Sequence, residues 1–260
     1  MKRVIFTAIA LVVALATVAG AQEMKKVRMG TEGAYPPFNF IDQNGQLAGF
    51  DVDIGNALCA AAKFDCEWVT QDWDGIIPGL QAEKYDTILA SMSITAERAE
   101  VVDFSDPYYQ ELGVLVGLEG TEYKGSFPET VAGKIVGAQS ATTHENFARD
   151  RLGESAAEIR TYDTVEQAHL DLTAGRIDFF LDGVIAVTGG FLDTDLGKGY
   201  QIIGPEIVDR EIYGDGAGIA VRKGDDQLRD ALNAALKQIR ADGTYQAISD
   251  RHFGVDIFGS

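Results

Sequence analysis

The sequence predicts an α/β protein built as two small lobes, each with a mostly parallel sheet flanked by helices. Three observations support this class. Short apolar segments alternate with amphipathic stretches from about residue 27 to residue 252, as in β-α-β units with parallel strands. The alternation occurs twice, and 260 residues suffice for one large or two modest domains. Two apolar segments, 112–118 and 202–208, are candidate crossover strands between the lobes.

The first unit opens with a strand over residues 27–31 and a loop marked by Pro36 and Pro37. A hairpin follows, because two apolar runs flank an Asp-Gln-Asn-Gly turn at residues 42–45. Asp51 is then expected to cap a helix that carries Ile54, Leu58 and Ala61 on one face. The rest of this unit is expected as a strand at 67–70, a helix at 75–82 and a strand at 85–89.

The second unit repeats the alternation. Strands are expected at 112–118, 134–137, 159–162 and 177–181, helices at 143–151 and 164–174, and a further segment at 186–192. The chain then predicts a strand at 217–222 and helices at 225–241 and 244–252, the first of them with leucines on one face.

The N-terminus has the pattern of a secretory signal peptide over residues 1–21. Two basic residues precede an apolar run over residues 4–18, and Ala-Gly-Ala at 19–21 forms a small-residue cleavage site. The apolar run barely reaches the length of a membrane span. We therefore expect a soluble, exported and periplasmic mature chain from about Gln22, without a lipid anchor.

The formal net charge of the chain is -18, and the predicted leader contributes basic residues to that sum. Nucleic-acid binding needs a basic face, so this class of function is excluded. The acidity weakly favours a cationic ligand, although it mostly reports solubility.

Two cysteines, Cys59 and Cys66, stand seven positions apart. In an oxidising compartment they can close one small loop as a disulfide, which is the reading we favour. Two buried thiols are the alternative. A metal pair is disfavoured, because no cluster of histidines or cysteines accompanies them.

The turn over residues 91–98, Ser-Met-Ser-Ile-Thr-Ala-Glu-Arg, lies between an apolar strand and the start of a polar helix. Unpaired backbone N–H groups at such a turn, together with the hydroxyls of Ser91 and Ser93, form an anion site. Arg98 adds a planar guanidinium that can hold a carboxylate at two points. The pattern indicates capture of a small carboxylate rather than chemistry upon it.

Residues 49–59, which begin Gly-Phe-Asp-Val-Asp-Ile, resemble the signature of solute-binding proteins, the extracellular component of amino-acid ABC importers. Segments 30–38, 72–78 and 104–109 are similar to further motifs of that family in order and spacing. The resemblance runs from about residue 27 to residue 258. The cysteine spacing resembles the disulfide of its lysine/arginine/ornithine- and histidine-binding branch.

This resemblance implies a type II periplasmic binding protein: a monomer of two lobes, with two crossover strands as hinge and the ligand in the cleft. Closure buries the ligand and presents a surface to a membrane permease. We expect residues 22–111 with 207–260 to form one lobe and residues 112–206 the other, with hinge strands at both boundaries.

The resemblance also implies roles for individual residues. Arg98 would hold the ligand carboxylate, aided by Ser93 and by Thr143 of the other lobe. Tyr35 and Trp73 would flank the ligand side chain, and a cation between aromatic faces suits an arginine-like or lysine-like group. Glu32 stands where this branch has an acidic partner for the distal cation. The expected ligand-binding residues are Glu32, Tyr35, Trp73, Ser91, Met92, Ser93, Arg98, Gln139, Thr142, Thr143, Asp182 and Gly183.

The sequence departs from the family where an Asp normally binds the α-ammonium. That Asp stands five residues after the Asp of a Gly-Arg-Ile-Asp motif, and here the position holds Gly183, with Asp182 one residue early. On a strand, a one-residue slip points a side chain to the opposite face. Either a bulge rescues Asp182, or the α-amine has no carboxylate partner. The second case favours a ligand whose α-amine is substituted, as in the opines.

The second lobe differs at Gln-Ser-Ala-Thr-Thr-His, residues 139–144, a turn that normally carries a Gly. His144 can face the cleft, although a single histidine is more often an ordinary surface group.

Other chemistries lack support in the sequence. The glycine-rich segment 214–218 leads into a strand rather than a helix, so it is not a phosphate loop. The three histidines share no metal spacing, and no Ser/His/Asp elbow is present. We expect no cofactor and no metal. The prediction is a receptor that captures a polar or cationic amino acid of the arginine, lysine, ornithine or histidine type and delivers it to an ABC permease. The alternatives are an opine-binding protein and an enzyme resembling the cyclohexadienyl dehydratases, with Asp182 as the candidate acid.

Overall fold

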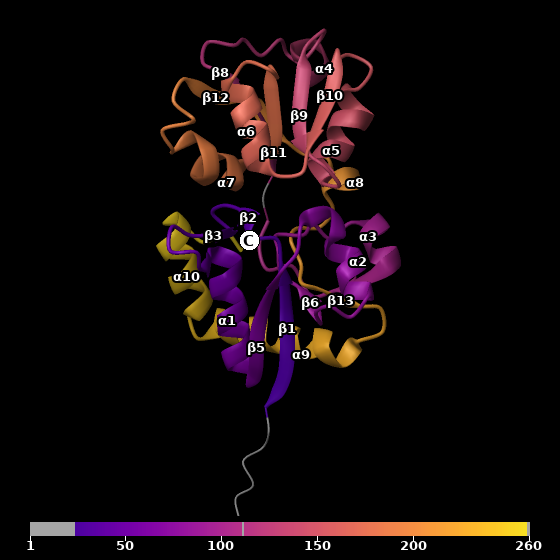
Figure 1. Cartoon of the computed structure of the whole chain (residues 1–260), viewed down its shortest axis with the longest axis vertical. Helices are drawn as coiled ribbons and strands as arrows, with labels where there is room; N and C mark the ends of the chain where they lie inside the picture. The colour runs from indigo at the N-terminus through magenta and orange to yellow at the C-terminus, as the bar shows by residue number, and fades with distance from the viewer. Residues whose placement is uncertain (1–23, 111, 259–260) are drawn as a thin grey trace, which may run out of the picture.

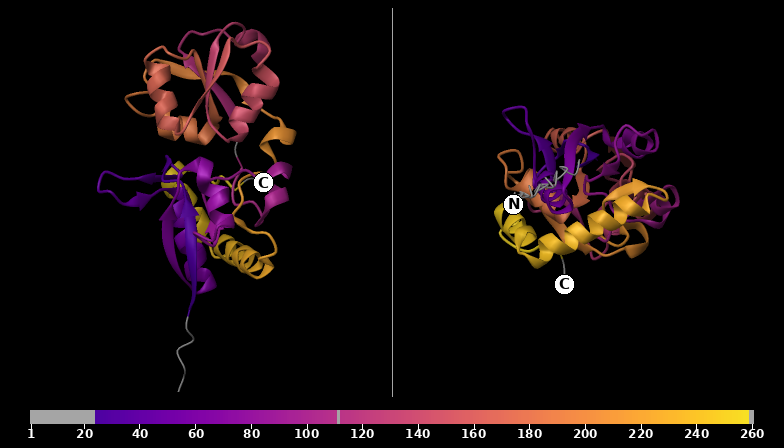
Figure 2. Two further views of the ribbon diagram at one scale, coloured as in Figure 1. Left: turned by 45° about the vertical axis from the view of Figure 1, so that its right-hand side comes forward. Right: turned by 90° about the horizontal axis from the view of Figure 1, so that it is seen from below.

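The computed structural model describes residues 24–110 and 112–258 and has two lobes stacked along the long axis of the molecule (Figure 1). Within the described residues each lobe contains one five-stranded sheet with helices packed around it. Figure 2 shows the same two lobes from two further directions. The predicted α/β class is confirmed. The predicted signal peptide, residues 1–21, lies outside the described residues.

The sheet of the first lobe has the strand order β5-β1-β6-β13-β7. Strand β1 runs parallel to its two neighbours β5 and β6, whereas β13 is antiparallel to β6 and β7. The strands are β1 (Lys25–Thr31), β5 (Phe64–Thr70), β6 (Thr87–Ile88), β7 (Val102–Phe104) and β13 (Ala220–Arg222). The chain thus returns to this lobe from the second one, which places β13 inside the first sheet.

The predicted hairpin after the proline pair is confirmed. It consists of β3 (Asn39–Ile41) and β4 (Leu47–Ala48), and the short strand β2 (Ala34–Tyr35) pairs with β3. The helical segments of this lobe are α1 (Phe50–Ala62), η1 (Trp73–Gly75), α2 (Ile76–Gln81), α3 (Ala96–Val101), α9 (Asp226–Ala241) and α10 (Thr244–Phe253).

The predicted capping role of Asp51 is wrong. Helix α1 begins at Phe50, its N-cap is Gly49, and no side chain caps it. Gly49 has a φ of 119°, and a Cβ there would lie 2.2 Å from the carbonyl oxygen of Phe38. Glycine fits this close approach, which leaves the fully buried Asp51 carboxylate for contacts deeper in the lobe.

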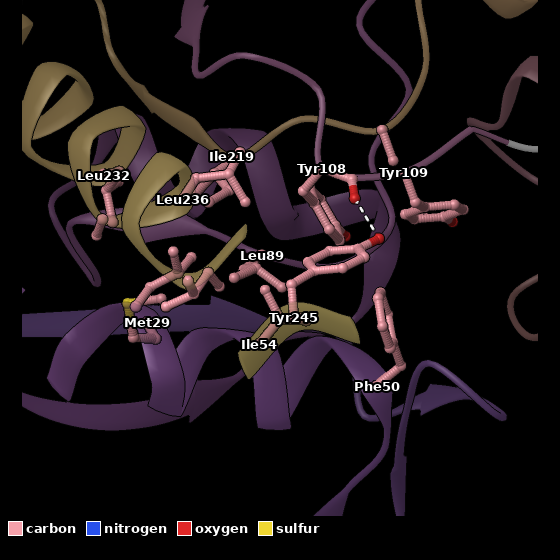
Figure 3. Close-up of a cluster of buried hydrophobic side chains, with 14 of the residues drawn as sticks. Met29, Phe50, Ile54, Leu89, Tyr108, Tyr109, Ile219, Leu232, Leu236 and Tyr245 are labelled. Carbon is pink, nitrogen blue, oxygen red and sulfur yellow. Dashed lines mark hydrogen bonds between the residues drawn. The ribbon is translucent and has the colours of Figure 1, made fainter. Parts of the chain in front are cut away.

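The core of the first lobe lies between α1, α9, α10 and the sheet (Figure 3). Met29, Ile54 and Leu236 are buried there, and burial of each such side chain contributes about 1.5–3 kcal/mol. The Tyr245 hydroxyl donates to the carbonyl of Tyr108 at 2.6 Å, so the core also fixes the segment that leads toward the second lobe.

The sheet of the second lobe has the strand order β10-β9-β11-β8-β12. Its strands are β8 (Gly113–Leu118), β9 (Ile135–Gln139), β10 (Glu158–Tyr162), β11 (Phe179–Gly183) and β12 (Tyr200–Ile207). Its helical segments are α4 (Phe127–Thr130), α5 (Thr143–Phe147), η2 (Ala148–Leu152), α6 (Val165–Thr173), α7 (Val184–Val187), η3 (Thr188–Leu192) and α8 (Arg210–Tyr213).

The two segments expected as crossovers, β8 and β12, pair antiparallel with each other in the second sheet. Ile207 pairs with Gly113, and Ile212 of α8 still packs in a core cluster with Leu115 and Val131. The exact lobe boundaries stay a prediction.

The predicted disulfide is confirmed. Cys59, near the end of α1, bonds to Cys66 of β5, and the two Cα atoms lie 6.2 Å apart. The bond joins the helix to the edge strand of the first sheet. Among the residues described, no helix combines the length and apolar character needed to cross a bilayer.

Candidate functional site

A cavity between the two lobes collects most of the predicted site residues. Its lining comprises Glu32, Tyr35, Trp73, Ala90, Ser91, Ser93, Arg98, Tyr109, Gln139, Thr142, Thr143, His144, Asp182, Tyr213, Gly216 and Ala217. Ten of the twelve residues expected to bind ligand are in this set. Residues of both lobes therefore face one space.

Two expected residues are outside this lining. The Met92 side chain is fully buried in a core cluster with Ile88 and Val102, because alternate residues of the turn point into the lobe. Gly183 is buried at the end of β11 and has no side chain to offer. Neither position contributes a side chain to the cavity.

The lining also includes residues that sequence reasoning missed, among them Tyr109, Tyr213 and Ala217. Ala217 pairs with both Ser93 and Tyr109 through isolated bridges, so this late segment supports the turn that carries Arg98. The glycines around Ala217 were the available signal, since they mark a backbone that approaches its neighbours closely.

The turn before α3 is held in place by hydrogen bonds to a buried acid, Asp51. Asp51 accepts hydrogen bonds from the Tyr108 hydroxyl at 2.7 Å, the Asn39 amide at 2.8 Å and the Ser91 hydroxyl at 2.9 Å. The backbone N–H of Ser91 donates in turn to the Tyr108 hydroxyl at 3.0 Å. Burial raises the pKa of Asp51 to about 6, although these three donors oppose the rise. The network fixes Ser91 in its left-handed conformation, with a φ of 53°.

Arg98 lies in the first turn of α3. The Thr95 side chain caps this helix by accepting from the backbone N–H of Arg98 at 3.2 Å. The Arg98 guanidinium donates to the carbonyls of Ser93 and Ala141, each at 3.1 Å, and its carbon lies 5.3 Å from the Trp73 ring centre. Burial lowers its pKa to about 10, so Arg98 still carries its charge at neutral pH.

The second lobe approaches Arg98 through the turn before α5. Ala141 has a φ of 56°, a conformation that glycine adopts more easily, and its carbonyl accepts from both Trp73 and Arg98. The Thr142 hydroxyl accepts from the Glu145 N–H and donates to the Gln139 carbonyl. This capped helix start faces the guanidinium across the cleft and adds N–H groups suited to an anion.

Two carboxylates line the same cavity. Glu32 follows β1 and accepts from the Gln139 amide at 2.6 Å. Burial raises the pKa of Glu32 to about 7, and repulsion from Asp182 adds to the shift. Asp182 accepts from the Tyr35 hydroxyl at 2.9 Å, and burial raises its pKa to about 7 as well.

Strand alternation predicted that Asp182 points away from the cleft unless a bulge is present, and this prediction is wrong. Strand β11 pairs with β8 in regular register from Phe179 to Gly183, so no bulge is present, yet Asp182 lines the cavity. Asp182 is the last residue but one of the strand, and at the end of a sheet a side chain from either face can reach the cleft. Asp182 therefore supplies a carboxylate to the cavity without a bulge in β11.

His144 belongs to the cavity rather than to the surface. Its Nε2 lies 3.2 Å from the Asp182 carboxylate, and its ring centre lies 5.2 Å from that of Tyr213. Burial lowers its pKa to about 3, and the Arg98 charge adds to the effect. His144 is therefore neutral at neutral pH.

The site combines one buried cation with two buried acids between two lobes. Such an arrangement can bind a small molecule that carries an anionic group and cationic groups. Among residues 24–110 and 112–258, no group of three or more histidine, cysteine or acidic side chains is placed to hold a metal ion.

The profile of the bacterial extracellular solute-binding proteins, family 3, matches residues 27–255. The chain belongs to this family. Its fold is the two-lobed type II periplasmic binding protein fold, with the cavity at the junction of the lobes.

Individual relatives agree with this membership. The L-arginine-binding protein of Pseudomonas aeruginosa is 44% identical over 236 residues, which cover 91% of each chain. The lysine/arginine/ornithine-binding periplasmic protein of Escherichia coli is 34% identical over 100% of both chains. A solved periplasmic binding protein of Salmonella typhimurium, described as having high arginine specificity, superposes with a TM-score of 0.81 at 32% identity and covers 88% of this chain and 99% of its own.

Proposed function

We propose that this protein is a periplasmic receptor that captures a cationic amino acid of the arginine, lysine or ornithine type and delivers it unchanged to an ABC permease. One observation carries the proposal: a buried guanidinium and two buried carboxylates line the same cavity between the lobes. A basic amino acid has the complementary charges, one negative and two positive.

Each charge of the ligand has a partner in the cavity. Arg98 and the N–H groups near Ser93 and Thr143 receive the α-carboxylate, and Asp182 receives the α-ammonium. Glu32 receives the distal cation. Charge-assisted hydrogen bonds contribute about 1.5–3 kcal/mol each, so two or three supply much of a micromolar affinity.

The two aromatic residues Tyr35 and Trp73 have different roles in the cavity. Tyr35 donates to Asp182 and so orients that carboxylate, while the Trp73 ring packs against the Arg98 guanidinium. Both rings line the cavity, and they flank the extended side chain of the ligand. Residues 1–21 act as the signal peptide that exports the chain, and the protein works as a monomer.

The test is calorimetry and thermal unfolding with arginine, lysine, ornithine, histidine, glutamine, citrulline and octopine. We expect the basic amino acids to bind with the highest affinity and to raise the melting temperature. A ligand at 100 times its Kd stabilises the folded state by about 2.7 kcal/mol. A panel in which glutamine or octopine binds more tightly than every basic amino acid would refute the proposal.

Asp182 also favours a second candidate, an enzyme. A buried acid whose pKa is raised to about 7 beside a neutral imidazole can serve as a general acid. The assay is incubation with prephenate and with arogenate, followed by mass spectrometry. Loss of water and carbon dioxide would establish this function, whereas recovery of arginine unchanged from the complex supports the receptor.

A further inference from the structure

Gln139 occupies the end of β9, where the second sheet meets the cleft, and it is 5% exposed. Its side-chain nitrogen donates to the Glu32 carboxylate at 2.6 Å and to the carbonyl of Asp163 at 3.0 Å. The Asp163 carbonyl can only accept a hydrogen bond, so the side-chain nitrogen must face it and the amide orientation is fixed.

The glutamine is held firmly by its own lobe. Its backbone pairs with Tyr162 of β10, and its carbonyl accepts from the Thr142 hydroxyl at 2.7 Å. Glu32, in contrast, belongs to the first lobe and follows the end of β1. The bond between Gln139 and Glu32 therefore spans the cleft and requires the closed arrangement of the lobes.

The surroundings of Glu32 otherwise disfavour its charge. Burial opposes ionisation, and the carboxylates of Asp182, Asp72 and Asp74 repel it. Gln139 acts in the opposite direction, since its donor stabilises the ionised form. Each amide N–H engages one acceptor, so the glutamine determines where the Glu32 carboxylate sits and favours its negative charge.

We propose that Gln139 is a positioning residue that couples closure of the cleft to selection of a cationic ligand side chain, because it fixes the Glu32 carboxylate across the cleft. This inference rests on the proposed function and deepens it. A neutral side chain of the same shape does not need an ionised Glu32, whereas a guanidinium does. Loss of Gln139 therefore weakens charge selection more than it weakens binding in general.

The neighbouring residue provides a matched control. The Ser140 hydroxyl donates to the Asp74 carboxylate at 2.9 Å, which is another cross-cleft hydrogen bond, exposed and not made to Glu32. If cross-cleft bonds serve closure alone, the S140A and Q139L variants weaken charged and neutral ligands equally. If Gln139 positions Glu32, Q139L alone changes the selectivity.

The experiment compares arginine with citrulline, its uncharged isostere, by titration calorimetry in wild type, Q139L, S140A, E32Q and the E32Q/Q139L double variant. We expect the ratio of the two affinities to fall by about tenfold in Q139L, which corresponds to about 1.4 kcal/mol. The ratio should stay at the wild-type value in S140A. In the E32Q background, Q139L should change it no further.

A folded Q139L protein whose arginine-to-citrulline ratio stays within twofold of wild type would overturn the inference. Folding is verified by circular dichroism, and if Q139L does not fold, Q139M is judged by the same criterion. The two failures are distinct. If wild type shows no preference for arginine over citrulline, the proposed function is wrong, and the inference falls with it. If wild type has that preference and the glutamine variants keep it, only the inference is wrong.

Discussion

Removal of the Arg98 guanidinium should abolish recognition of the ligand carboxylate while leaving recognition of the rest of the ligand largely intact. The appropriate change is Arg98→Met, because methionine keeps an unbranched stem to pack beside Trp73. Arginine should then lose affinity, whereas agmatine, which is arginine without its carboxylate, should not.

The magnitude follows from the hydrogen bonds of Arg98. A guanidinium has five N–H donors, and two of them are used on the carbonyls of Ser93 and Ala141. Three donors remain within the described structure, which is enough for a carboxylate held at two points. At about 1.5–3 kcal/mol for each charge-assisted bond, the loss is about 3–6 kcal/mol, or about 10²- to 10⁴-fold in Kd.

Calorimetric titration of both ligands into wild type, R98M and R98K supplies the test. R98K keeps the charge but cannot form the planar two-point contact, so its affinity for arginine should fall between the other two proteins. Two results would refute the reasoning: an R98M protein that binds arginine within threefold of wild type, or one that loses arginine and agmatine affinity equally.

Three further predictions concern pH and stability. Glu32 and Asp182 have pKa values raised to about 7 and are protonated below it, so binding of a cation releases protons and arginine affinity should rise between pH 5 and 8 by calorimetry; a flat profile would contradict the assignment. The folded-state pKa of Asp51, about 6, exceeds its usual 3.8, so its stabilising contribution is complete below pH 4 and is lost as the pH rises through 6; in urea titrations the free energy of unfolding of wild type should fall over this range by on the order of 3 kcal/mol more than that of D51N. Replacement of Cys59 and Cys66 by serine should lower the free energy of unfolding by about 2–3 kcal/mol for a loop of this length, and a reducing agent should destabilise wild type but not the double variant.

Much of the fold could be predicted because hydrophobic periodicity reports burial directly. Helix α9 follows its leucine pattern within a residue of the expected start. The start of α1 could not be predicted in the same way. Asp51 is a good capping residue by type, but a tight contact between Gly49 and Phe38 sets the helix start and leaves the acid to a network that includes Tyr108. Residues far apart in sequence form that network, and no local pattern contains it.

The candidate site was likewise predictable only in part. Motif spacing brought Arg98 and Glu32 to one cavity, because the turns that carry them end neighbouring strands of one sheet. The orientation of Asp182 was not predictable from strand alternation, which holds inside a sheet and fails where a strand ends. The sequence alone favoured an ordinary surface position for His144. Its burial depends on Tyr213 of α8, which packs beside it but lies far away along the chain.

The position of β13 has a consequence for the order of folding. All five strands of the second sheet come from one continuous stretch, residues 113–207, whereas the first sheet needs residues 220–222 between β6 and β7. The second lobe can therefore assemble from contiguous chain, but the sheet that supports Arg98 stays split until a distant segment arrives. Contacts of such large sequence separation form slowly, so the half of the molecule that begins first along the chain should be the last to reach its native structure.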